Sequence, residues 1–322
     1  MAVRIESNNQ AVYEDDKLYL RFDGNQGGTL VDFRWKRQAP NYNVCQDKGG
    51  MWLNTSYDGI SDGTNKGAYQ ATEKRAKFTR LTAQDLWIEG EMHYGDRLNE
   101  LGPFRYKIGF SFWGGWIYQK IVLTCTAAVE GKRFYAINQA MDFDQSWNKA
   151  IVPSRKLWVG RSEEWRLATI GTNDINEVET IQELGHVSTL YKIFGNMRST
   201  PQQPLWGGMA CGDFGLIVVA PRAWHEISIG WNAGFNWALD GSWRSETVGN
   251  SFVRSLETAH ILGDGNRRYL ESLDPNSGIE YRPPNPLLRD GQIISWDVAL
   301  FPYEGRNVAS AVNWVRSSGY PI

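Results

Sequence analysis

The chain has 322 residues and a net charge of −2, with 42% hydrophobic and 22% charged residues. This is ordinary globular composition, and a chain of this length buries a large core without disulfides or a structural metal. The near-neutral charge gives no indication of nucleic acid or an anionic membrane as a partner, and no apolar run approaches the roughly 18 residues of a membrane span.

The N-terminal residues, MAVRIESNNQ, do not combine a positive segment with an apolar one, so no export signal is visible. We expect a soluble protein, either cytoplasmic or secreted with its signal removed. The three cysteines, Cys45, Cys125 and Cys211, are sparse and odd in number, which argues against a disulfide framework. No cofactor and no metal are expected, and the sequence leaves the oligomeric state open.

Alternating apolar and polar residues predict strands through most of the chain. A pair of strands is expected around Gly114-Gly115, and six Asp-Gly dipeptides favour tight turns between strands. The expected strands lie within 77–94, 104–127, 134–143, 156–159, 165–170, 215–220, 226–231, 252–262 and 293–302. The fold class is therefore all-β, an antiparallel β-sandwich, as a single domain over 1–322.

Helical patterns are few. An apolar spacing of three over 178–187 favours a short helix ending near Gly185. Val308, Ala311, Val312 and Val315 favour another near the C-terminus. One or two short helices are therefore expected beside the strands.

Tryptophan is unusually frequent, with 15 copies among the 322 residues. A large flat indole packs in β-cores and also stacks on sugar rings. The segment 222–246 interleaves indoles with amides, carboxylates and Arg, which is the chemistry that sugar faces and hydroxyls require. The candidate sugar-binding residues are Trp224, Trp231, Asn232, Trp237, Trp243 and Arg244. The alternative is that this segment forms two core strands joined by an Asn/Gly loop.

Two stretches carry a family resemblance. LYLRFDGNQGGTLVDFRW (18–35) resembles the opening hairpin of galactose-mutarotase-like β-supersandwich proteins, and WIYQKIVLTCTAAVEGKRFYAINQAMDF (116–143) is similar to their long central hairpin. The resemblance implies a supersandwich and carbohydrate chemistry. Aldose epimerases of this family carry a His after the central hairpin, whereas this chain has Asn138-Gln139-Ala140 there. The fold also serves lyases and hydrolases, so it does not choose the reaction.

Only four histidines are present, and two of them have suitable neighbours for proton transfer. His93, Tyr94 and Arg97 lie at the end of an expected strand, and they supply a base, an acid and a carboxylate-binding cation, as β-elimination on a uronic acid requires. His225 lies in the Trp-rich segment. In the family a late carboxylate acts as base, and the resemblance makes Glu280 or Glu304 candidates for that role.

Other motifs are weaker. The Gly-x-Ser-x-Gly at 59–63 lies in an Asp/Gly loop rather than in a strand–turn–helix. The sequence contains no His-x-x-x-His and no Cys-x-x-Cys motif, so a standard zinc site is not indicated.

The leading hypothesis is an enzyme that uses acid/base chemistry on an oligo- or polysaccharide in a Trp-lined cleft, leaning to a polysaccharide lyase on an acidic glycan. The alternatives are a glycoside hydrolase with paired carboxylates, an aldose 1-epimerase-like enzyme and a non-catalytic carbohydrate-binding protein.

Overall fold

The computed structural model describes residues 2–45, 53–58, 65–70, 75–94, 100–129, 134–143, 149–153, 165–169, 205–220, 227–233, 254–261 and 288–318. These residues form two β-sheets, the 3-10 helix η1 (Gly24–Gln26) and the α-helix α5 (Val308–Ser317). Within these ranges, no helix is both long enough and apolar enough to span a bilayer.

The smaller sheet is an antiparallel meander at the N-terminus. Its four strands run in the order β1 (Ala2–Glu6), β2 (Gln10–Glu14), β3 (Leu18–Asp23) and β4 (Thr29–Trp35). The β3–β4 hairpin confirms the opening hairpin expected from the sequence. Its connection contains Gly27, whose φ of +68° is reached easily only by glycine.

The larger sheet contains 14 strands, in the order β13-β12-β14-β15-β18-β10-β9-β8-β6-β5-β11-β17-β16, with β7 also paired to β8. Every pairing is antiparallel. The strands are β5 (Leu53–Asp58), β6 (Asn65–Tyr69), β7 (Lys77–Arg80), β8 (Asp85–Tyr94), β9 (Leu101–Trp113), β10 (Trp116–Cys125), β11 (Phe134–Phe143), β12 (Lys149–Pro153), β13 (Trp165–Thr169), β14 (Leu205–Cys211), β15 (Phe214–Ala220), β16 (Ile227–Ala233), β17 (Arg254–Ile261) and β18 (Ile293–Glu304).

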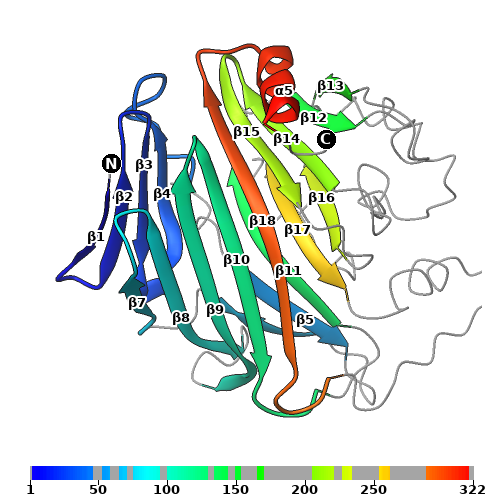
Figure 1. Ribbon diagram of the computed structural model, residues 1–322. Helices are drawn as coiled ribbons and strands as arrows, with labels where there is room; N and C mark the ends of the chain where they lie inside the picture. The colour runs from blue at the N-terminus through cyan, green and yellow to red at the C-terminus, as the bar shows by residue number, and fades with distance from the viewer. Residues whose placement is uncertain are drawn as a thin grey trace, which may run out of the picture.

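The main core lies between the small sheet and strands β8, β9, β10 and β18 of the large one (Figure 1). Strand β9 shows how the alternation produces it. Phe104, Tyr106, Ile108, Phe110 and Phe112 are all buried on one face. Because successive side chains of a strand point to opposite faces, the residues between them form the outer face of the sheet.

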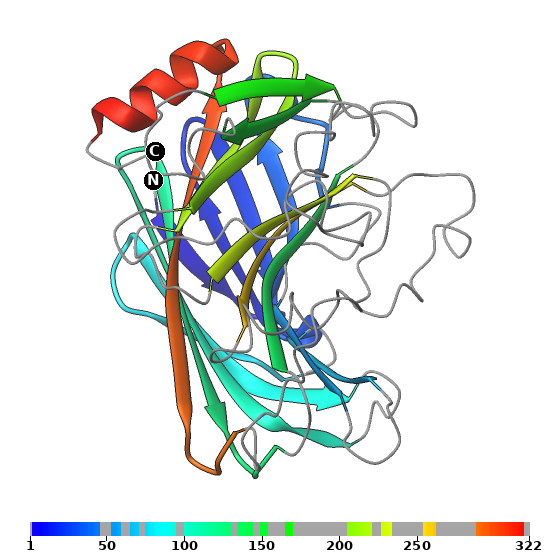
Figure 2. The same cartoon turned by 90° about the vertical axis from the view of Figure 1, so that its right-hand side faces the viewer.

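A second core lies on that outer face, beneath α5. The helix buries Val308, Ala311, Val312 and Val315 against the strands, and Figure 2 shows it along one end of the curved large sheet. The four buried residues are those whose spacing predicted this helix. Asn307 caps it, since its side chain accepts a hydrogen bond of 2.9 Å from the backbone N–H of Ser310.

Strand β18 joins the two cores. It lies between β10 and β15, and its alternate residues enter opposite layers. Val298 and Leu300 belong to the main core, whereas Ala299, Phe301 and Tyr303 belong to the core beneath α5.

The all-β sandwich class is confirmed, and most predicted strands are present. The stretch 77–94 is two strands, β7 and β8, joined by a turn at 81–84. Strand β18 continues past Pro302 to Glu304, because it keeps pairing with β15 there. The expected strand 156–159 and helix 178–187 lie outside the described residues.

Candidate functional site

The sequence-predicted site residues fall on several parts of the chain. His93 and Tyr94 end β8, are half-buried, and pair with Tyr69 and Ala68 of β6. Trp231 and Asn232 lie on β16, opposite Leu256 and Ser255 of β17. The remaining candidates lie outside the described residues: Arg97, Trp224, His225, Trp237, Trp243, Arg244 and Glu280.

The strand pairing does not bring His93 close to Trp231 along the sheet. A single lateral row runs from His93 through Tyr69, Asn54, Ile137 and Ala259 to Ser228. Five strand spacings of about 4.8 Å give roughly 24 Å along the surface of the sheet. A cleft shared by His93 and the tryptophans of segment 222–246 therefore stays a prediction.

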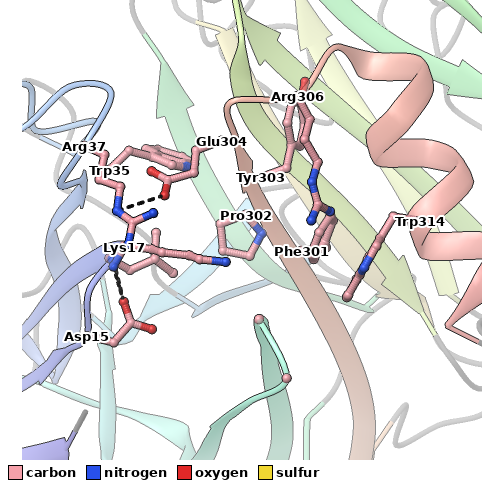
Figure 3. Close-up of a pocket in the computed structure, with 13 residues that line it drawn as sticks. Asp15, Lys17, Trp35, Arg37, Phe301, Pro302, Tyr303, Glu304, Arg306 and Trp314 are labelled. Atoms are coloured by element: carbon pink, nitrogen blue, oxygen red, sulfur yellow. Dashed lines mark hydrogen bonds and ion pairs between the residues drawn. The ribbon is translucent and has the colours of Figure 1, made fainter.

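A pocket is present at the opposite end of the long strands, where β18 extends beyond β10. Ile117, the second residue of β10, pairs with Leu300. The later residues of β18 pair with β15, from Pro302 with Leu216 to Glu304 with Phe214. The turn Gly114-Gly115 lies beside this overhang, and the pocket of ≈ 230 Å³ forms there between β18, the small sheet and α5 (Figure 3).

Glu304 is the carboxyl group at the centre of this pocket. Its side chain is only 10% exposed, and its Oε1 lies 3.9 Å from Nε of Arg37. Its Oε2 is buried and makes no hydrogen bond within the described part of the chain. Burial raises the pKa of Glu304, and the charges of Arg37 and Lys17 oppose that shift only in part.

Three basic side chains line the same pocket, from three different segments. Lys17 comes from the β2–β3 turn, Arg37 follows β4, and Arg306 precedes α5. Figure 3 shows the Lys17 side chain reaching across the pocket below Glu304. Arg37 also forms an ion pair with Asp16, with an Nη2–Oδ2 distance of 2.6 Å. The lining has three cations and two carboxylates, and Asp16, which pairs with Arg37, brings the charges in and next to the pocket to three of each sign.

The second carboxylate of the pocket, Asp15, has a structural role. It accepts hydrogen bonds from the backbone N–H groups of Lys17 at 2.7 Å and Leu18 at 2.6 Å, and from the hydroxyl of Tyr13 at 2.9 Å. These bonds fix the β2–β3 turn and occupy the carboxylate. Glu304 is thus the carboxyl group of the described lining that is available for proton transfer.

Aromatic rings form the walls. Trp35 is fully buried and stacks on Phe33, with a centroid separation of 4.4 Å. On the α5 side, Trp314 stacks on Phe301 at 4.2 Å, and the guanidinium of Arg306 lies 5.7 Å from the Trp314 ring centroid. These rings form the apolar part of the lining, next to its charged groups.

Sequence reasoning had weighed Glu304 but had missed Lys17, Arg37 and Trp314. Charged residues flanking a hairpin are usually solvated, so no local signal separates these two cations from the other Lys and Arg of the chain. Trp314 was hidden within an amphipathic helix pattern. In the described part of the chain, no three His, Cys, Asp or Glu side chains gather as a metal site would require.

Comparison with known proteins gives a likeness of fold. No family model and no curated protein matches the sequence. An α-mannosidase from Enterococcus faecalis V583 matches 98% of this chain with a TM-score of 0.50 at 9% identity, and the match covers 31% of the mannosidase chain. A galactose mutarotase-like protein from Lactobacillus casei ATCC 334 matches 91% of this chain and 100% of its own, with a TM-score of 0.48 at 9% identity. A galactose mutarotase related enzyme from Lactobacillus acidophilus matches 92% of this chain and 98% of its own, with a TM-score of 0.45 at 8% identity.

The resemblance is one of fold. Galactose mutarotase-like proteins, the family that the two hairpins resemble, are among the structures that match this chain. At these identities, residue roles do not transfer between the proteins.

Proposed function

We propose that the protein is a carbohydrate-active enzyme that acts on an acidic glycan by β-elimination, with Glu304 as the proton-transfer group. The observation that carries this proposal is the buried carboxyl of Glu304, with its raised pKa, in a pocket lined by Lys17, Arg37 and Arg306. A carboxyl group whose pKa is shifted toward neutral pH is a better acid/base catalyst than an ordinary solvated one.

The cations supply the second requirement of the reaction. Removing the C5 proton of a uronate places negative charge on its carboxylate, and Lys17 or Arg37 would stabilise that charge. The C5–H electron pair forms the C4=C5 double bond, and the C4–O pair leaves with the departing oxygen. Because Asp15 is occupied, Glu304 would take the C5 proton and return it to that oxygen. This route requires both groups to lie on one face of the sugar ring.

The occupied Asp15 also makes a hydrolase with paired carboxylates less suitable for this pocket. Such an enzyme needs a second carboxyl group about 5–9.5 Å from the first, free to act on the sugar or on water. The volume of ≈ 230 Å³ is below the roughly 300–1,000 Å³ of drug-sized ligand pockets, so it suits one sugar unit. His93, Tyr94, Arg97 and His225 remain proposed as an alternative acid/base set.

A polysaccharide panel tests the proposal. Wild type, Glu304→Gln and His93→Ala are incubated with polygalacturonate, alginate, hyaluronan and neutral glucan, and both ultraviolet absorbance of unsaturated product and new reducing ends are measured. We expect unsaturated product on an acidic glycan, lost by at least about 10²-fold in Glu304→Gln but retained in His93→Ala. Loss in His93→Ala alone would move the chemistry to the end of β8. Reducing ends without unsaturation would indicate a hydrolase.

A further inference from the structure

The outer face of the large sheet carries a second hollow, away from Glu304. It has a volume of ≈ 540 Å³ and crosses β8, β9, β10 and β18. Its side chains come from two neighbouring lateral rows. One row runs Trp87, Gly109, Lys120 and Asp297, and the other runs Asp85, Ser111, Tyr118 and Ala299. Directly paired residues of antiparallel strands share a face, so these rows form one surface.

Gly109 forms the floor of the hollow, and the Trp87 ring lies flat over it. A Cβ built on Gly109 would come within 2.9 Å of the ring. The missing side chain therefore lets the indole lie against the sheet instead of projecting from it. The ammonium group of Lys107 lies 5.0 Å from the centroid of this ring. The sheet backbone covers one face of the ring, and a sugar that stacks on the other face would displace the exposed Lys107 side chain.

Tyr118 forms the opposite wall. It stands two strands from Trp87, which corresponds to about 10 Å across the floor. Its ring stacks on that of Trp113 with a centroid separation of 4.9 Å, and Trp113 is 55% exposed. Two aromatic surfaces thus face a hollow wide enough for a sugar ring.

Charges of both signs surround the hollow. Asp85, Asp297 and Lys120 line it, and Lys107, near the Trp87 ring, pairs across the strands with Glu89. Asp85 is itself held by the hydroxyl groups of Ser111 at 2.6 Å and Thr82 at 2.5 Å. A polar rim with carboxylates and an ammonium group beside flat rings matches a neutral sugar, whose C–H face stacks on an indole and whose hydroxyls bond to such groups.

We propose that this outer groove, lined by Trp87, Ser111, Tyr118, Lys120 and Asp297, binds a neutral oligosaccharide. The groove would act as a binding site separate from the Glu304 pocket. It does not depend on the proposed reaction, because the groove and the Glu304 pocket share no lining residue.

Native gel electrophoresis through soluble neutral polysaccharides (mannan, xylan, β-glucan and galactan) tests the site. We expect at least one of them to retard the wild type, and Trp87→Ala and Tyr118→Ala each to raise the Kd by about tenfold or more. Tyr19→Ala is the matched control. Like the Trp87 ring, the Tyr19 ring lies near a cation, with the guanidinium of Arg34 5.8 Å from its centroid, but Tyr19 lies on the small sheet. Tyr19→Ala and Glu304→Gln should bind as the wild type does.

Trp87→Ala and Tyr118→Ala remove large side chains and could disturb folding, so Lys120→Ala is a second test, because Lys120 is exposed. It should fold as the wild type does and bind more weakly. No retardation by any neutral polysaccharide, or unchanged binding in Trp87→Ala and Lys120→Ala, would overturn the proposal. So would a wild-type dimer in size-exclusion chromatography that Trp87→Ala converts to a monomer, because the groove would then be a subunit interface. Loss of lyase activity in Glu304→Gln leaves this result unaffected.

Discussion

At the scale of single residues, Glu304 combines burial with an incomplete set of partners. Its nearest cation, Arg37, is 3.9 Å away and shared with Asp16. Because that ion pair is long, Arg37 does not fully offset the cost of burying the charge. The pKa of the group is therefore raised above that of a solvated carboxyl, which is common at sites of proton transfer.

This shift predicts how stability depends on pH. The folded-state pKa of Glu304 lies above its ordinary value of 4.5, so the folded protein binds this proton more strongly than the unfolded chain does. The contribution to stability is complete below pH 4.5 and is lost as the pH rises through the raised pKa. Urea denaturation from pH 4 to 8 should show wild type losing stability relative to Glu304→Gln. A pH-independent difference would contradict the shift.

The cations should act by stabilising negative charge on the substrate carboxylate. We expect Lys17→Ala to lower kcat/KM for an acidic glycan by about 10-fold or more, since an interaction with developing carboxylate charge is lost. Lys77→Ala is the control, because Lys77 is exposed on β7 and does not line the pocket. Equal effects of both substitutions would show that net charge, and not this pocket, matters.

The sequence identified Glu304 as a late carboxylate but did not identify its surroundings. The pocket joins the β2–β3 turn and the end of β4, both near the N-terminus, with the end of β18, near the C-terminus. Spacing rules report on neighbours in sequence. They carry no signal for a cation delivered by a distant hairpin, so Lys17 and Arg37 were not predicted.

At the scale of elements, Gly27 secures the contact between the two sheets. Its carbonyl oxygen accepts hydrogen bonds from Tyr106 Oη at 2.9 Å and from Gln70 Nε2 at 2.7 Å. Its φ is +68°, and an added Cβ would lie 1.8 Å from the carbonyl oxygen of Gln70. No side chain fits this position without moving one sheet from the other.

A pair of substitutions separates backbone strain from this contact. Gly27→Ala combines a left-handed backbone, costing about 1–2 kcal/mol, with overpacking of about 1–3 kcal/mol. Gly212→Ala has a similar φ of +60° but open space around its Cβ, so it should show the first cost alone. Chemical denaturation measures both. Equal losses of stability in the two variants would mean that the close contact at Gly27 adds no cost beyond the backbone strain.

Local elements were predicted well and their neighbours were not. The β9–β10 hairpin follows from alternation on both sides of Gly114-Gly115, whose φ values of +63° and +83° suit a two-residue turn. By contrast, β11 lies between β5 and β17, and β18 lies between β10 and β15. These pairings join distant parts of the chain and depend on the complementarity of whole faces, which a one-dimensional pattern does not contain.

At the scale of the whole molecule, the two cores should unfold together, because β18 belongs to both. Ile121 lies in the main core and Ile217 in the core beneath α5, and both are fully buried. Ile121→Val and Ile217→Val should each cost about 0.5–1.5 kcal/mol and shift one common transition. Tryptophan fluorescence and far-ultraviolet circular dichroism should give the same midpoint. A separate early transition in Ile217→Val would show that the cores are independent.

The central place of β18 also affects how the protein is made. During synthesis, β10 and β15 leave the ribosome long before their shared neighbour does, so each has an unpaired edge while the intervening chain is translated. Such edges pair readily with other chains, and distant strand pairing is slow. The nascent protein therefore passes through a stage in which its sheet is divided in two. A chaperone that covers strand edges would be most useful to it then, before the last strand arrives and closes the sheet.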